Sequence, residues 1–376
     1  MRRLRNLALF AVVALGLIFV LAWTFRDQLM PLLGVSVDAG SGGEATLHLP
    51  DGYTASVYAR GLQGPRFMAV SPDGVLYVAE RGADRVVALP DSDGDGRADE
   101  IVEVGSGYGR GQDLAFTADG TLLVAAEETL WEVMLDGLRE SDRRAVVNDL
   151  PVGGFHSTKS VAMLPDGRIL LAIGSSCNVC DEEDAERATV QLVTGDGDLR
   201  PWMVGLRNAV GLWVDTDTGR PWATNMGRDF LGDQHPPETI YELVEGADGG
   251  WPRCHAGDLP DPEFGTDTAA CDGVAEPAVT FAAHMAPLGL VAWEDHLLVA
   301  MHGSWNSSVK VGYALWWLPW DGAPAGEPKP FATGFLPDAA DDALGRPVGV
   351  VVGADGALYV SDDKAGFIYR IARSGQ

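Results

Sequence analysis

One phrase recurs six times along this chain: a polar residue, a short apolar run, a turn that usually reads D-G or D-T-G, and a second apolar run. The first copy reads RFMAVSPDGVLYVAE. The copies begin at Arg66, Gln112, His156, Arg207, His284 and Arg346. A strand–turn–strand repeat with a period of roughly 40–50 residues is typical of a β-propeller with four strands in each blade. The sequence therefore predicts an all-β, six-bladed propeller.

The 376 residues divide into three predicted segments. We expect a membrane anchor or signal peptide over residues 1–25, a linker over 26–44 and the propeller over 45–376. The segment LHLPDGYTASVYA, around residue 50, is expected to close the ring by pairing with the last blade, because closure removes exposed sheet edges. The two longest steps between copies predict insertions that form walls of a site at one face.

The N-terminus has the pattern of a membrane segment. Arg2, Arg3 and Arg5 precede an uncharged stretch from Leu7 to Phe25. This length is just enough to cross the hydrocarbon core as a helix, and the arginines favour a cytoplasmic N-terminus. We predict an uncleaved transmembrane helix with the propeller on the periplasmic or extracellular side. A cleaved signal peptide is the alternative, but no good cleavage site follows the apolar run, and in both cases the propeller is exported.

The formal net charge is −27, and lysine occurs at only four positions. Nucleic-acid binding needs a basic surface, so this balance argues against a nucleic-acid partner. An acidic surface is compatible with divalent cations and with solubility.

Four cysteines in an exported chain suggest disulfides. Cys254 and Cys271 flank an insertion rich in Pro, Gly and Asp, which a disulfide between them would hold together. The pair Cys177 and Cys180 could be a tight disulfide or a metal pair, and the disulfide is the reading we favour. Asp181, not histidine, follows this pair, so the signature for c-type haem attachment is not present.

A segment of alternating carboxylates and glycines, DSDGDGRAD, has the spacing of a calcium-binding loop. Its candidate ligands are Asp91, Asp93, Asp95 and Asp99. Val102 stands where such loops usually have a bidentate glutamate. We predict a structural calcium site in the outer part of a blade, with an acidic turn as the alternative.

Polar residues that begin the repeats are candidates for a site at the mouth of the central channel. His156 has a side chain suited to general-base catalysis near neutral pH. Arg207 and Asn208 can hold a planar anionic ligand, and Arg346 and Arg66 would face the same funnel. The alternative is that His156 is structural and that each arginine pairs with a neighbouring carboxylate.

Two further segments are unlike simple blade loops. NMGRDFLGDQHPPE, from Asn225 to Glu238, offers carbonyl and carboxylate oxygens that suit a cation. HGSWN, from His302 to Asn306, places polar and aromatic residues directly after a strand, a composition typical of a ligand-binding wall.

Together these strings resemble the PQQ-dependent sugar dehydrogenases, enzymes that use pyrroloquinoline quinone (PQQ). The resemblance is to the L-sorbosone dehydrogenase-like branch, which is related to the soluble aldose sugar dehydrogenases. It rests on PDGVLYVAE, DSDGDGRADE, LPDGRILLAIGSSCNVC, GLRNAVGL, RDFLGD, GGWP, HGSWNSS, GRPVGV and DGALYVSDD, and it extends from about residue 50 to 373.

The resemblance implies a six-bladed propeller that binds PQQ and calcium and oxidises an aldose or sorbosone-type sugar by hydride transfer to the quinone. It implies that His156 is the general base and that Arg207 and Asn208 contact the quinone oxygens. Arg346 would bind a PQQ carboxylate, and the carbonyls of Gly227 and Arg228 would bind the calcium. His302 and Asn306 would be wall residues.

Some positions depart from the family pattern. Val210 stands where the soluble glucose enzymes have glutamine, and their cofactor-binding lysine has no clear counterpart. The expected partners are a small sugar, a separate electron acceptor such as a cytochrome or quinone, and the membrane. The alternatives are a non-catalytic propeller that binds a partner and a calcium-dependent lactonase.

Overall fold

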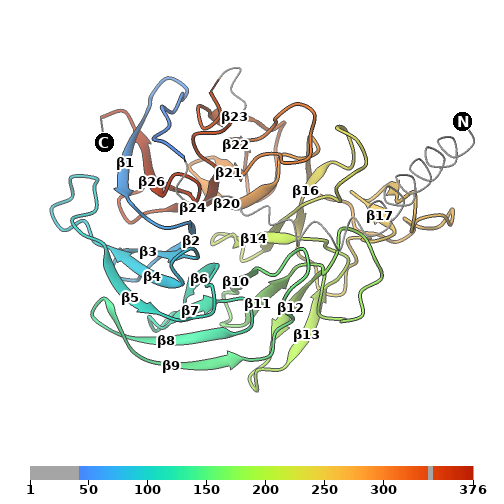
Figure 1. Ribbon diagram of the computed structural model, residues 1–376, viewed down its shortest axis with the longest axis horizontal. Helices are drawn as coiled ribbons and strands as arrows, with labels where there is room; N and C mark the ends of the chain where they lie inside the picture. Colours follow the sequence, from blue (N-terminus) through green and yellow to red (C-terminus); the bar gives the residue numbers. More distant parts are fainter. Residues whose placement is uncertain (1–41, 338–341, 376) are drawn as a thin grey trace, which may run out of the picture. The chain divides into compact units, whose positions relative to one another are not determined.

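The computed structural model describes residues 42–337 and 342–375. Six four-stranded antiparallel sheets surround a central axis as the blades of a propeller (Figure 1). The elements of this part of the chain are all strands. The prediction of an all-β, six-bladed propeller is confirmed.

In blades 1 to 3 the four strands follow one another along the chain from the axis outward. Blade 1 contains β2 (Pro65–Val70), β3 (Leu76–Glu80), β4 (Arg85–Leu89) and β5 (Val102–Ser106). Blade 2 contains β6 (Asp113–Phe116), β7 (Leu122–Ala125), β8 (Leu130–Asp136) and β9 (Arg139–Val147). Blade 3 contains β10 (Lys159–Met163), β11 (Ile169–Ile173), β12 (Thr189–Val193) and β13 (Leu199–Met203).

Blades 4 to 6 have the same strand order, with an insertion in blade 4 and a strand from the start of the domain in blade 6. Blade 4 contains β14 (Ala209–Val214), β15 (Pro221–Asn225), β16 (Glu238–Glu242) and β19 (Val279–Phe281). Blade 5 contains β20 (Pro287–Trp293), β21 (His296–Met301), β22 (Ala314–Pro319) and β23 (Lys329–Ala332). Blade 6 contains β24 (Pro347–Val352), β25 (Leu358–Asp362), β26 (Phe367–Arg373) and β1 (Tyr53–Arg60).

The predicted ring closure is confirmed. Strand β1 pairs antiparallel with β26, with Tyr53 opposite Arg373. The first and last described strands thus share one blade, which holds the two ends of the propeller together without an open edge at that point.

The recurring D-G turns join the inner strands to the second strands. Gly74 and Gly356 have φ values of +84° and +78°. Glycine adopts this left-handed conformation without a steric penalty, which is why the turn residue is so regular in the sequence.

The inner strands of neighbouring blades are in close contact around the axis. A Cβ atom on Gly211 would collide with the Leu288 carbonyl oxygen of the next blade. The Thr224 hydroxyl accepts a hydrogen bond from the Gly211 amide (2.9 Å) and donates one to the Leu288 carbonyl (2.9 Å), which links blades 4 and 5. A buried apolar cluster of Phe67, Val210, Leu288 and Val348 lies on four of the inner strands. This packing joins the inner strands of neighbouring blades around the axis.

The insertion in blade 4 contains a two-stranded ribbon, β17 (Cys254–His255) and β18 (Leu259–Pro260). A disulfide joins Cys254 to Cys271, as the sequence predicts. A second disulfide joins Cys177 to Cys180, so the metal-pair alternative is set aside for the oxidised protein.

The predicted membrane segment and most of the linker lie outside the described residues. Within the described ranges, no helix is long and apolar enough to cross a membrane.

Candidate active site at the channel mouth

Two sets of loops meet at one end of the propeller. Each inner strand runs antiparallel to the second strand of its blade, so the residues before an inner strand lie beside those that follow a second strand. Contacts between neighbouring blades, described below, bring these loops together. We call this end the mouth.

His156 lies in the loop before β10 and is partly buried. Its Nδ1 lies 2.9 Å from the Ser175 hydroxyl oxygen. Among the described residues, no hydrogen-bond partner is found for its Nε2. Desolvation and the positive charge of Arg207 lower the pKa of His156 well below its usual value. The imidazole is therefore neutral at pH 7, the state that a general base requires.

Arg207, in the loop before β14, is buried and donates four hydrogen bonds. It donates to both the carbonyl and the side-chain oxygen of Asn178, at 2.9 and 2.8 Å. It also donates to the Gly227 carbonyl at 2.7 Å and pairs with Asp229 at 2.8 Å. The pairing with a neighbouring carboxylate that the sequence left open is observed here. Arg207 thus joins the loops that follow β11 and β15.

Asn208 lies beside His156 and directly follows Arg207. Its backbone amide donates to the Asn225 side chain (3.0 Å). A Cβ atom on Gly174 would meet the side chains of His156 and Asn208 at 2.5 and 2.8 Å. Only glycine permits this close approach, which brings the loops before β10 and β14 together.

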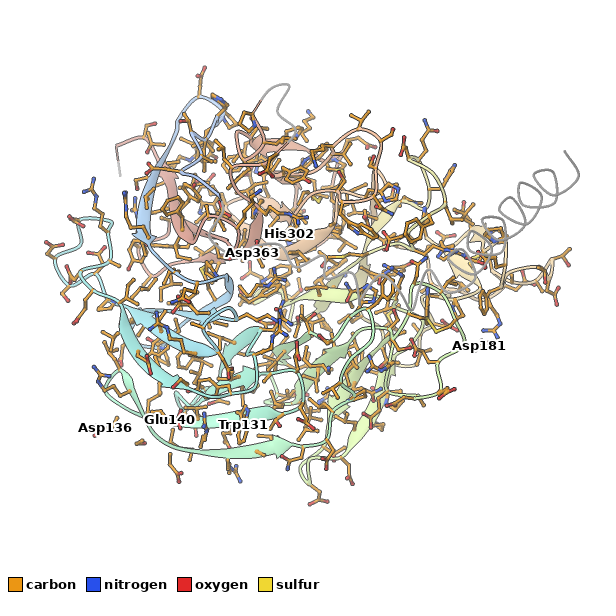
Figure 2. All side chains as sticks on the ribbon, viewed as in Figure 1. Trp131, Asp136, Glu140, Asp181, His302 and Asp363 are labelled. Carbon is orange, nitrogen blue, oxygen red and sulfur yellow. A yellow bond between two sulfur atoms is a disulfide. The ribbon has the colours of Figure 1, made fainter. Side chains whose placement is uncertain are left out.

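The other side of the mouth contains a second histidine. His302, directly after β21, lies 3.0 Å from Asp363, and Arg66 pairs with the same carboxylate at 2.5 Å. Arg346 donates to the carbonyls of His302 (2.9 Å) and Gly303 (2.6 Å). Figure 2 shows His302 and Asp363 together near the ring centre, whereas Trp131 and Glu140 lie on the outer strands of blade 2.

The neighbouring arginines influence the protonation of both His302 and Asp363. Desolvation and Arg346 lower the pKa of His302 to about 4. Burial opposes ionisation of Asp363, but His302 and the two arginines hold its pKa well below the usual value. The pair is therefore a carboxylate that accepts a hydrogen bond from a neutral imidazole.

Three further cations lie near the mouth. Lys159 and Arg187 are on the His156 side, and Arg81 directly follows β3 of blade 1. Lys159 is fully buried and donates to the carbonyls of Pro151 and Ser157. Arg187 is buried and donates to the Val152 carbonyl at 2.7 Å. Burial and the charge of Arg187 lower the pKa of Lys159 to about 8. Arg81 forms an ion pair with Glu127, which lies in the loop after β7 of blade 2. In the described part of the chain, neither Lys159 nor Arg187 has a carboxylate partner.

The two predicted calcium-binding carbonyls lie in the loop after β15. The Gly227 amide donates to the buried Glu238 (2.8 Å), and burial raises the pKa of this carboxyl to about 7. The side chain of Arg228 is directed into the blade-4 insertion, where it pairs with Asp261 at 2.6 Å and Glu263 at 2.9 Å. Carbonyl and carboxylate oxygens are thus gathered around residues 227–229, a donor set that suits a hard cation.

The predicted calcium loop lies between β4 and β5, away from the mouth. Oxygens of Asp91, Asp93 and Asp99 lie within 4.8 Å of one another, and Asp95 is not part of this group. Both carboxylate oxygens of Asp91 accept backbone amides of the same loop, including that of Gly96 at 3.0 Å. The position in the outer part of a blade is as predicted, and calcium binding stays a prediction.

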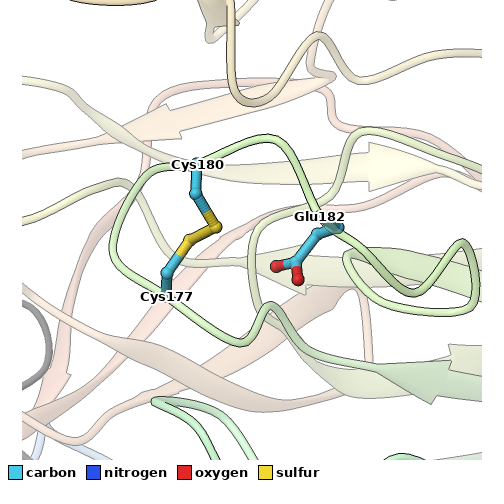
Figure 3. Close-up of side chains that lie close together, drawn as sticks. All are labelled: Cys177, Cys180 and Glu182. Carbon is cyan, nitrogen blue, oxygen red and sulfur yellow. A yellow bond between two sulfur atoms is a disulfide. The ribbon is translucent and has the colours of Figure 1, made fainter.

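Figure 3 shows the Cys177–Cys180 disulfide with Glu182 beside it. Glu182 accepts hydrogen bonds from the Ser176 amide and hydroxyl, at 2.7 and 2.6 Å, so it stabilises this loop. The predicted wall residue Asn306 has a buried Nδ2 that lacks a partner within the described ranges.

Sequence reasoning missed Ser175, Asn178 and Asp363. All three follow a second strand, in the strings GSSCNVC and SDDK. Their position opposite the repeat starts is the signal that could have identified them, since an antiparallel pair brings these ends together.

The fold and the mouth define a class: six-bladed propellers with neutral histidines and arginines gathered at one end of the channel. A family model described as TrAA12-like matches residues 47–237 and 259–374. The chain belongs to the TrAA12-like family.

The curated proteins that are similar in sequence include one from a fungus and one from a bacterium. A pyrroloquinoline quinone-dependent pyranose dehydrogenase of Coprinopsis cinerea is 24% identical over 404 residues, covering 87% of this chain and 54% of that protein. An uncharacterized protein of Borreliella burgdorferi is 28% identical over 220 residues, covering 55% and 57%. The chain spans a little over half the length of these relatives.

Solved structures share the fold. The PQQ domain of the Coprinopsis cinerea pyranose dehydrogenase, in its holo form, has a TM-score of 0.77 at 21% identity, covering 89% of this chain and 98% of that one. A calcium structure of a Trichoderma reesei AA12 enzyme has a TM-score of 0.79 at 20% identity, with the same coverage. A PQQ-bound aldose sugar dehydrogenase of Streptomyces coelicolor has a TM-score of 0.63 at 19% identity, covering 86% and 100%.

Proposed function

We propose that this chain is an exported, membrane-anchored oxidoreductase that uses PQQ and calcium to oxidise an aldose or sorbosone-type sugar. The observation that carries the proposal is His156, a neutral histidine whose Nε2 has no hydrogen-bond partner among the described residues. It lies between buried cations, at the end of the propeller where the repeats begin. The similarity to PQQ-dependent relatives supports the cofactor and the class of substrate.

The charges at the mouth fit a polyanionic cofactor. Lys159 and Arg187 are enclosed by protein, and no ion pair is found for either of them within residues 42–337 and 342–375. Burying a cation without an opposite charge is costly, so an anion at the mouth would offset this cost. PQQ has three carboxyl groups, which match this need.

Specific residues would hold each group. Arg66 and Arg346 would bind carboxylates of the cofactor, and Asn208 with Arg207 would contact its quinone oxygens. Arg207 would act from a fixed position, because Asn178 and Asp229 already hold it. When bound, PQQ supplies the two-electron acceptor that takes hydride from the anomeric carbon, so that an aldose becomes a lactone.

Calcium would be held by the carbonyls of Gly227 and Arg228. Asp229 and Glu238 add negative charge next to this position. A bound cation would also favour the ionised form of Glu238, which burial otherwise disfavours at neutral pH.

The chain itself would perform the proton transfer. Nε2 of His156 would accept the proton of the anomeric hydroxyl as the C–H bond is broken. Desolvation, together with the positive charge of Arg207, keeps the imidazole neutral before the reaction. Electrons would then pass to a separate acceptor, a cytochrome or a quinone.

Reconstitution tests the proposal. The purified full-length chain with PQQ and calcium is expected to reduce an artificial dye when aldoses are added. Omitting PQQ is the control and should remove the activity. Binding of PQQ without turnover of any aldose would contradict the substrate class. No binding of PQQ would favour a propeller that only recognises a partner.

A further inference from the structure

Two hydrogen bonds lead from His156 through the Ser175 hydroxyl to the Cys177 carbonyl, a group that can only accept a hydrogen bond. The Ser175 hydroxyl lies 2.7 Å from the carbonyl oxygen of Cys177 and 2.9 Å from Nδ1 of His156. A carbonyl can only accept a hydrogen bond, and a hydroxyl has one proton to donate. If that proton points to Cys177, the serine oxygen can only accept from the imidazole.

We infer that Ser175 is a positioning residue that fixes the tautomer of His156, with the proton on Nδ1 and the lone pair on Nε2. Ser175 is completely buried, so water does not compete for its hydroxyl. This inference deepens the proposed function and rests on it for its catalytic meaning. The tautomer places the basic lone pair on the nitrogen that has no partner among the described residues.

The Cys177–Cys180 disulfide holds the far end of this chain in place. It closes a four-residue loop that contains Asn178, and Asn178 in turn holds Arg207 through its side-chain and backbone oxygens. The backbone of Ser175 is also bound from both sides: its amide donates to the Arg207 carbonyl at 2.8 Å, and its carbonyl accepts from the His156 amide at 3.2 Å. One small loop therefore orients both the base and the arginine beside it.

The tautomer can be read directly from ¹⁵N spectra of the histidine ring in the full-length chain without cofactor. The seven histidines are distinguished by comparison with His156→Gln. The wild-type protein is expected to show a protonated Nδ1 and an unprotonated Nε2 for His156. A proton on Nε2 would overturn the inference.

Ser175→Ala removes the acceptor for the Nδ1 proton. We expect its His156 signals to move to values averaged between the two tautomers, and turnover to fall roughly 10- to 100-fold, part of the usual contribution of a general base. Ser175→Thr keeps the hydroxyl and should restore the wild-type pattern. The matched control is Ser160→Ala, which removes a buried hydroxyl of β10 for which the described residues offer no hydrogen-bond partner, and it should leave the spectrum unchanged.

The role of the loop is tested by Cys177→Ala/Cys180→Ala. Opening the loop should shift the His156 signals in the same direction as Ser175→Ala. An unchanged spectrum in either variant would refute the corresponding part of the inference. Because the spectra need no PQQ, they stand apart from the proposed function: a fixed tautomer without PQQ binding would contradict only the latter.

Discussion

The two histidines at the mouth are both neutral, but they differ in what their Nε2 atoms do. In His302, Nε2 lies 3.0 Å from the Asp363 carboxylate and must donate its proton to it. In His156, Nδ1 faces a hydroxyl, and Nε2 has no partner in the described part of the chain. The comparison teaches that a lowered pKa alone does not make a base: His156 can accept a proton at Nε2, whereas His302 anchors a charged cluster.

Arg207 and Arg346, the arginines beside the two histidines, differ in how they are held by the protein. Arg207, beside His156, is bound by Asn178, Gly227 and Asp229 and cannot move without breaking these contacts. The side chain of Arg346, beside His302, donates to two carbonyl oxygens and lies over the Tyr313 ring. We expect the His156 half of the mouth to control turnover and the His302 half to control affinity for the cofactor.

The largest expected effect comes from His156→Asn. Loss of the proposed base should lower turnover about 10²- to 10⁴-fold, while PQQ affinity stays near that of the wild-type protein. Steady-state dye reduction and cofactor titration measure the two quantities. Full activity in this variant would show that another residue is the base.

Next in size is the effect of Arg207→Met on stability. The change leaves Asp229 buried without its partner, so the free energy of unfolding should fall by about 3–5 kcal/mol. Arg207→Met/Asp229→Asn should recover part of the loss. Urea denaturation of both variants checks this, and equal stability of the single variant and wild type would argue against the buried pair.

Arg346→Ala tests the His302 half of the mouth. Removing the charged donor proposed to bind a PQQ carboxylate should weaken PQQ binding by roughly 10- to 100-fold, the equivalent of about 1.5–3 kcal/mol. Turnover at saturating PQQ should change little. A loss of turnover with unchanged affinity would reverse the roles assigned to the two halves.

A smaller effect is expected from pH. The pKa of His302 is about 4 in the folded protein and about 6.5 in an unfolded chain, so the unfolded state binds more protons between these values. Compared with His302→Asn, the wild-type protein should lose about 1.2 kcal/mol of stability per pH unit as pH falls from 6 to 4.5. The exposed His235→Asn serves as the control. A difference that does not depend on pH would contradict the neutral imidazole.

The smallest effect is expected at the loop between β4 and β5, which is far from the chemistry. If calcium binds there, removing it with a chelator should lower the melting temperature by a few degrees, corresponding to about 1 kcal/mol. Asp91→Asn should show the lower temperature with and without calcium. Identical melting of wild type and variant in calcium would remove this site.

The fold could be predicted almost completely, because each repeat contains its own turn chemistry and apolar pattern. The D-G turns, the closing strand β1 and the Cys254–Cys271 disulfide appear as expected. The sequence also placed His156 and Arg346 at the mouth, since both begin a repeat.

The partners of these residues could not be predicted from the same pattern. Ser175 and Asp363 lie in the loops that follow second strands, and they meet His156 and Arg66 only through the three-dimensional register of the blades. The direction of the Arg228 side chain depends on the blade-4 insertion, which has no counterpart in the repeat. The positions of single residues could therefore be predicted from the sequence. Their protonation states could not, because these depend on neighbours far along the chain.

The division of the mouth is tested most directly by titrating PQQ into full-length wild type, His156→Asn and Arg346→Ala in the presence of calcium. The absorbance of the cofactor is followed first, and an aldose is then added at saturation. The account predicts that His156→Asn binds like wild type without bleaching by the sugar, and that Arg346→Ala binds weakly but bleaches. Loss of binding in His156→Asn together with normal binding in Arg346→Ala would contradict it.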